Sequence, residues 1–117
     1  MNQLKKTVYA LMIQLNSLLD EHGFLKKRTV WTPDIAKALA KKEKIMLIDE
    51  HWQVIYFLRK HYETHHNTPA IRLLVKSLKE QYGSVIGNSL YLQILFPISP
   101  AVQSAKISGL PKPKRCI

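Results

Sequence analysis

The stretch Asp49-Glu50-His51-Trp52-Gln53-Val54-Ile55-Tyr56-Phe57-Leu58-Arg59-Lys60-His61-Tyr62 decides the fold. Its apolar side chains recur at the spacing of an α-helix, at Trp52, Ile55, Leu58 and Tyr62. Val54 and Phe57 widen this stripe beyond a single face. The pattern predicts a helix from a capping Asp49 to about Thr64, more buried than any other in the chain, and therefore a mainly α protein.

Four further helices are marked by capping residues or by proline in the first turn, on either side of this stretch. They are expected from Thr32-Pro33-Asp34 to about Lys42, from Thr68-Pro69 to about Tyr82, from Asn88 to Pro97 and from Ser99-Pro100 to about Ile107. Gly109 is expected to stop the last of them. About five helices in one short chain predict a small helical bundle.

The two ends of the chain carry different signals. Residues 8–13 form a short apolar run, which is compatible with either a strand or a helix. Near the other end, Pro111 and Pro113 lack amide donors and favour extended backbone in the residues before them. We expect one domain, residues 1–117, in which residues 109–117 form a mobile but stiff extended arm, hinged at Gly109.

The composition excludes several classes of protein. The chain has 117 residues, of which 46% are apolar, which is enough for one core without metal or disulfide staples. No apolar run approaches the roughly 20 residues that cross a bilayer. A lone cysteine fits a reducing compartment. We therefore expect a soluble, cytoplasmic protein that makes no membrane contact and is monomeric when free.

The chain is strongly basic. Its formal net charge is +10, from 18 Lys and Arg against 8 Asp and Glu. Such a field attracts nucleic acid, or a partner that carries nucleic acid. A general enrichment in lysine would give the same excess, so the charge alone does not select a partner.

Cys116, the only cysteine, is the second-to-last residue. The thiolate is the reactive form of cysteine, and the charges of Lys112, Lys114 and Arg115 favour it, while the nearby terminal carboxylate opposes it. A stiff arm also loses less entropy on docking than a flexible one. These features predict a group carrier, and the alternative is an incidental thiol in a disordered basic tail.

The histidines do not predict a metal site. His61 and His65 are four residues apart and would share one helix face. The His-Glu-x-x-His pattern is absent, and no set of cysteines or carboxylates completes a coordination sphere. We expect neither a metal nor a cofactor.

Arg72, Lys76 and Lys79 form a basic helix face that leaves an alternative open. With the preceding turn, the two helices around residues 49–82 are compatible with a helix-turn-helix that places this face in a DNA groove. A solvated face, or a contact face for a partner protein, explains the same residues.

The C-terminal Gly109-Leu110-Pro111-Lys112-Pro113-x-x-Cys116-Ile117 resembles the signature of the DsrC/TusE family of sulfur-carrier proteins. The resemblance covers residues 23–117. Its main upstream matches are Gly23-Phe24-Leu25, Trp31, Asp49-Glu50-His51-Trp52, Asn67-Thr68-Pro69-Ala70-Ile71-Arg72, Gly87-Asn88-Ser89 and Leu95-Phe96-Pro97. The resemblance implies a small orthogonal helical bundle with a short N-terminal β-hairpin, here expected within Met12–Leu19.

Ala105 distinguishes two branches of this family. DsrC proteins of dissimilatory sulfur metabolism carry a second cysteine at this position, which argues against a role as a partner of a dissimilatory sulfite reductase. The one-cysteine branch implies a relay in which Cys116 accepts sulfur as a persulfide from a TusBCD-type complex. It then passes the sulfur to an MnmA-type tRNA thiolase for 2-thiolation of the wobble uridine. Candidate partner-docking residues are Lys112, Lys114, Arg115, Lys106 and Arg72.

Overall fold

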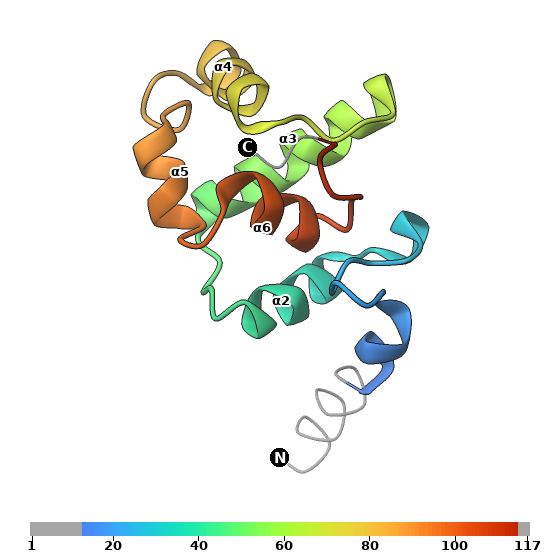
Figure 1. Ribbon diagram of the computed structural model, residues 1–117. Helices are drawn as coiled ribbons and strands as arrows, with labels where there is room; N and C mark the ends of the chain where they lie inside the picture. Colours follow the sequence, from blue (N-terminus) through green and yellow to red (C-terminus); the bar gives the residue numbers. More distant parts are fainter. Residues whose placement is uncertain (1–12, 115–117) are drawn as a thin grey trace.

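The computed structural model describes residues 13–114, and this part of the chain is mainly α-helical (Figure 1). Residues 13–18 are helical and precede the short 3₁₀ helix η1. The named elements are η1 (Arg28–Val30), α2 (Pro33–Lys42), α3 (Asp49–His65), α4 (Ile71–Tyr82), α5 (Ser89–Leu95) and α6 (Pro100–Ile107). The five predicted helices are therefore confirmed, with small differences at their ends.

Helix α6 lies at the centre of the bundle. It packs against α2, α3, α4 and α5, and Figure 1 shows α2 and α4 on opposite sides of it. Five of its eight residues are buried, against four of seventeen in α3, so the expectation that α3 is the most buried helix is wrong. The reason is that α6 carries small side chains such as Ala101, Ser104 and Ala105, which let its neighbours approach closely.

Two of the predicted helix starts are confirmed by their hydrogen bonds. The Thr32 hydroxyl accepts from the Ile35 amide at 3.2 Å, and Pro33 occupies the first helical position of α2. The Asn88 side chain accepts from the amides of Leu90 and Tyr91 at 2.9 and 3.2 Å. Side-chain caps at these positions satisfy amides that the helix itself leaves without partners.

Two other starts differ from the prediction. Asp49 lies inside α3, whose cap is Ile48. Helix α4 starts after Ala70 rather than at Thr68-Pro69, because the Thr68 hydroxyl bonds elsewhere. Helix α6 starts at Ser99-Pro100 as predicted, although the Ser99 side chain makes no capping bond. Gln103 Oε1 accepts from the amides of Ile98 and Ser99.

The predicted β-hairpin within Met12–Leu19 is wrong for the part that the structure describes, and Met12 lies outside the described residues. Residues 13–18 are helical, and residues 13–114 contain no β-strand, only an isolated antiparallel bridge between Leu19 and Leu25. Leu15 and Leu19 are both buried, four residues apart. This helical spacing of the two core side chains explains why helix replaces the expected strand.

A tight turn connects this first helical segment to Leu25. The Asp20 carboxylate accepts from the amides of His22 and Phe24 at 2.8 and 2.9 Å, and the Asp20 amide donates to the Phe24 carbonyl at 2.7 Å. Gly23 supplies the positive φ of 85° that the turn needs.

Within the described residues, no helix has the length and apolar character needed to cross a membrane.

Candidate functional site at the base of the C-terminal segment

The C-terminal segment starts from a regular helix stop at Gly109. This glycine has a φ of 71°, and its amide donates to the Lys106 carbonyl at 3.1 Å. The next amide, of Leu110, donates to the Ala105 carbonyl at 3.0 Å. The two bonds form a Schellman motif, which confirms the predicted stop. Leu110 is only 1% exposed, so the first residues of the predicted arm belong to the core.

Trp31 and Arg59 hold the last turn of α6. Trp31 Nε1 donates to the Ile107 carbonyl at 3.0 Å, and Arg59 Nη1 donates to the Ser108 carbonyl at 2.8 Å. The Arg59 guanidinium also lies 4.1 Å from the centre of the Trp31 ring. Burial lowers the pKa of Arg59 from its ordinary value, and the nearby Glu63 carboxylate acts in the opposite direction. These contacts satisfy carbonyls that a helix end leaves open.

Thr68 makes the outermost described hydrogen bond to the segment. Its hydroxyl donates to the Pro111 carbonyl at 2.8 Å, and Figure 1 shows the segment rising from α6 toward the connection between α3 and α4. Gly109 itself is enclosed, because an added Cβ would lie 2.5 Å from Trp31 Cδ1. Beyond Pro111, Pro113 is buried, so Gly109 is not the point at which the described chain leaves the body.

The candidate docking residues lie in different surroundings. Lys112 and Lys114 are exposed on either side of the buried Pro113, and Arg72 is exposed on α4. Lys106 is only 18% exposed, because its ammonium lies 3.7 Å from the Glu43 carboxylate. It also lies over the Phe24 ring at 5.2 Å, which gives it a packing role. Arg115 and Cys116, the predicted persulfide residue, lie outside the described residues.

A cleft opens beside the start of the arm. It has a volume of about 430 Å³ and lies between the turn of residues 20–26 and the first arm residues. Its lining residues are Asp20, His22, Phe24, Leu25, Lys26, Pro111 and Lys112. The turn that follows the first helical segment therefore forms one wall of this cleft.

Sequence reasoning missed the three side chains that attach the arm. Trp31 entered only as part of the family pattern, Arg59 was read as part of a helix, and Thr68 was interpreted as a helix cap. A polar residue next to a wide apolar stripe was the only local signal for Arg59. The partners of Trp31 and Thr68 lie 76 and 43 residues away in the chain, so no local pattern predicts them.

The buried His51 has a structural role. Its Nδ1 accepts from the Ile48 amide at 3.0 Å, and its Nε2 donates to the Leu95 carbonyl at 2.7 Å. Burial lowers the pKa of His51, which keeps the ring neutral, as these two bonds require. The adjacent Glu50 accepts from the Tyr91 hydroxyl at 3.1 Å. The pair Glu50-His51 therefore stabilises the junction of α3 with α5.

The rings of His61 and His65 lie close, with centres 4.4 Å apart on one face of α3. His61 also lies 3.3 Å from the Asn67 side chain, and burial lowers its pKa. Among the described residues, no group of three or more histidine, cysteine, aspartate or glutamate side chains is arranged to hold a metal ion.

The fold and the site define a class of small helical proteins in which the central helix continues into an attached, basic C-terminal segment that carries the only cysteine of the chain. The family model described as "DsrC like protein" matches residues 13–117. The chain therefore belongs to the DsrC-like family.

Individual relatives agree with this family. The chain is 46% identical over 109 residues to a "Sulfurtransferase TusE homolog" of Haemophilus influenzae, covering 91% of this chain and 100% of the relative. It is 49% identical over 98 residues to "Sulfurtransferase TusE" of Buchnera aphidicola, covering 84% of this chain and 86% of the relative. The solved structure of DsrC from Allochromatium vinosum superposes with a TM-score of 0.78 at 42% identity, covering 85% of this chain and 88% of that one.

Proposed function

We propose that this protein is a sulfur carrier in a cytoplasmic relay. Cys116 accepts sulfur as a persulfide from a TusBCD-type complex and passes it to an MnmA-type tRNA thiolase, for 2-thiolation of the wobble uridine of tRNA. The observation that carries the proposal is a solitary cysteine three residues beyond the buried Pro113, the last described residue that packs against the body. The names of the relatives, sulfurtransferase TusE, support the same activity.

Each transfer is an exchange between sulfur atoms without net oxidation or reduction. The Cys116 thiolate attacks the outer sulfur of the donor persulfide. A new S–S bond forms to Cys116, the donor S–S bond breaks, and its electron pair leaves with the donor thiolate. In the second transfer an acceptor thiolate attacks the outer sulfur carried on Cys116. Cys116 then leaves as the thiolate, ready for another cycle.

The attached base of the arm determines how far the thiol reaches. A fully extended chain gains at most about 3.3–3.6 Å per residue, so the three residues from the buried Pro113 to Cys116 span about 10 Å. We assign to Lys112, Lys114 and Arg115 the electrostatic docking of this arm. A thiol at that distance from the body can enter a partner's cleft while the bundle stays outside.

The residue at position 105 supports a carrier that works with one cysteine. Ala105 is fully buried in α6, and its carbonyl accepts from the Leu110 amide. A cysteine here, as in the two-cysteine relatives, would offer a thiol that expels the carried sulfur and closes a disulfide. With alanine the persulfide on Cys116 has no resolving thiol within its own chain.

The test is the intact mass of the protein after incubation with a persulfide donor. Wild type should gain the mass of one sulfur atom and lose it again on reduction. Cys116→Ser should gain none while keeping its circular dichroism spectrum and thermal midpoint. Equal mass gain in both proteins, or none in either, would refute the proposal.

A further inference from the structure

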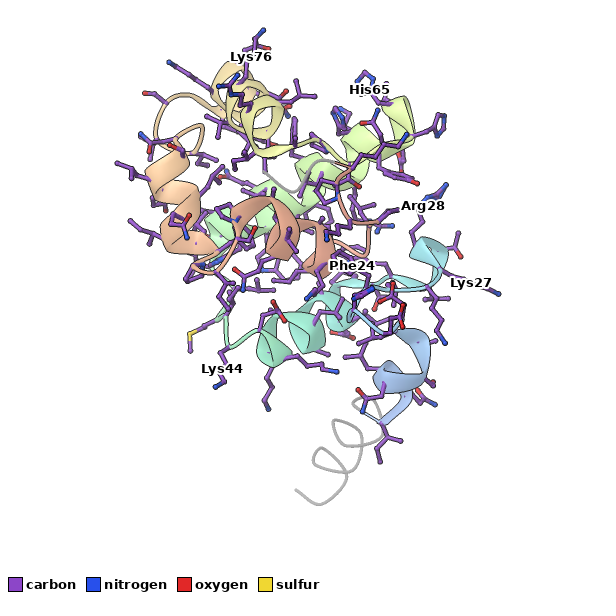
Figure 2. The ribbon with its side chains drawn as sticks, in the orientation of Figure 1. Phe24, Lys27, Arg28, Lys44, His65 and Lys76 are labelled. Carbon is purple, nitrogen blue, oxygen red and sulfur yellow. The ribbon has the colours of Figure 1, made fainter. Side chains whose placement is uncertain are left out.

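Five exposed basic side chains surround the start of the C-terminal arm. Two lie in the connection that leads into η1, one is the first residue of η1, and two lie on the arm. They are Lys26, Lys27, Arg28, Lys112 and Lys114, and are called here the basic rim. Lys26 and Lys112 line the same cleft, so the two parts of the rim meet there. Figure 2 shows Lys27 and Arg28 reaching into solvent on the side of the molecule away from Lys44.

The rim is oriented by buried groups next to it. Pro113 is buried while the lysines on either side of it are exposed, so Lys112 and Lys114 both face solvent. The Arg28 guanidinium lies 5.0 Å from the centre of the Tyr62 ring. Arg28 is also close enough to Arg59, which holds the Ser108 carbonyl, for its charge to act on that guanidinium. The rim and the arm base thus form one surface.

The rim keeps its positive charge available. Within residues 13–114 the ion pairs are His22–Glu21, Lys37–Asp34 and Lys106–Glu43, and none includes a rim residue. Asp20 is the one acid that lines the cleft, and its carboxylate already accepts two backbone amides. The field over the arm base is therefore positive and suited to a polyanion.

The surroundings of the rim favour nucleic acid over an acidic protein. None of the large exposed apolar side chains of the described chain lies in residues 19–31 or 110–114. Protein interfaces have an apolar centre from which lysine is depleted. Phe24 and Leu25, which line the cleft beside the lysines, are buried. Exposed lysine and arginine around buried apolar residues are instead typical of contacts to phosphates, which fix position without reading sequence.

The length of the arm connects the rim to the site of transfer. Lys112 lies four residues before Cys116, so the two are at most about 14 Å apart along an extended chain. When Cys116 reaches the acceptor thiol beside the target uridine, the rim lies near the phosphates that flank this nucleotide. We propose that the basic rim binds the phosphate backbone of the tRNA anticodon arm during sulfur delivery, an inference that rests on the proposed function.

The experiment compares two double variants of equal charge. Lys26→Gln/Lys27→Gln removes two exposed charges from the part of the rim that lies outside the arm, and Lys41→Gln/Lys44→Gln removes two exposed charges at the end of α2 and just after it. Binding of an unmodified tRNA transcript with uridine at the wobble position is measured by fluorescence anisotropy over a series of salt concentrations. Thermal midpoints show that both variants are folded.

The rim variant should bind tRNA more weakly, and its slope of log K against log salt should be shallower by about 1.4–1.8, for two lost phosphate contacts at about 0.7–0.9 each. The α2 variant should keep the wild-type slope. Equal slopes for the two variants would overturn the proposal, because the charge effect would then be unspecific. Unchanged tRNA binding together with weaker binding to the tRNA-free thiolase would also overturn it, and would make the rim a protein-docking surface.

The proposed function is checked separately in the same samples. Both variants keep Cys116 and should gain one sulfur atom from a persulfide donor, as wild type does. If wild type gains no sulfur, the proposed function fails whatever the tRNA result. If loading is normal and the rim variant binds tRNA like wild type, only the inference about the rim fails.

Discussion

Replacing Gly109 by alanine tests whether the base of the arm is a fixed attachment. Gly109 combines a φ of 71° with close contact to Trp31, whose Cδ1 would lie 2.5 Å from an added Cβ. Real Cβ atoms essentially never approach a neighbour this closely, so the indole must move. Movement of the ring also strains the hydrogen bond from Trp31 Nε1 to the Ile107 carbonyl.

The expected loss of stability has two parts. A residue with a Cβ in the left-handed region costs about 1–2 kcal/mol. Overpacking against the indole, with loss of its hydrogen bond, costs about 1–3 kcal/mol more. The sum, about 2–5 kcal/mol, is a large part of the roughly 5–15 kcal/mol that stabilises a domain of this size.

The measurement is urea unfolding followed by tryptophan fluorescence, with Gly23→Ala as a control. Gly23 has a similarly positive φ of 85°, but the nearest atom to an added Cβ is Lys106 Nζ at 3.6 Å, which is an ordinary contact. The control should therefore lose only the backbone part, about 1–2 kcal/mol. If Gly109→Ala costs no more than Gly23→Ala, the indole does not enclose Gly109, and the attachment of the arm base described above is wrong.

Three further predictions concern the chemistry of the carrier, the core and the arm. Mild oxidation of Ala105→Cys should give a product lighter by two hydrogens, the mass of a disulfide between the new cysteine and Cys116. The variant should also fail to keep a stable persulfide on Cys116, and retention of the persulfide would contradict the role given to the solitary thiol. His51 has a pKa below its unfolded value of 6.5, so its neutral form stabilises the fold above that value. The urea midpoint should therefore fall as the pH drops below about 6.5, and fall less in His51→Gln; identical pH profiles for the two proteins would exclude this residue as a cause. Thr68→Val, which keeps the shape but removes the hydroxyl, should raise hydrogen exchange of the Leu110 amide about fivefold, for about 1 kcal/mol lost, whereas Thr68→Ser should not.

Local signals predicted much of the helical framework. The caps at Thr32 and Asn88 and the stop at Gly109 involve groups within a few residues of one another, so short stretches of sequence contain both partners. The hairpin expected within Met12–Leu19 came from the family resemblance and not from a local pattern. Burial of Leu15 and Leu19 against the core, four residues apart, explains why residues 13–18 are helical.

The site was less predictable, because its contacts join distant parts of the chain. Thr68 has the residue type of a cap, but its hydroxyl donates to the Pro111 carbonyl, 43 residues away in the chain. Lys106 has the residue type of a docking group, but its ammonium pairs with the carboxylate of Glu43, the residue that follows α2. The central position of α6 was equally hidden, because small residues give a weak apolar pattern even where packing is tightest.

The burial of Pro113 also makes the end of the arm a short tether. Three residues keep Cys116 within about 10 Å of a point that is packed against the body. In the proposed relay, a partner bound beside that point meets the carried sulfur at an effective concentration in the millimolar range, however dilute the protein is in the cell. Transfer then depends on where the partner's cleft opens relative to Pro113, so tether length and cleft depth have to match.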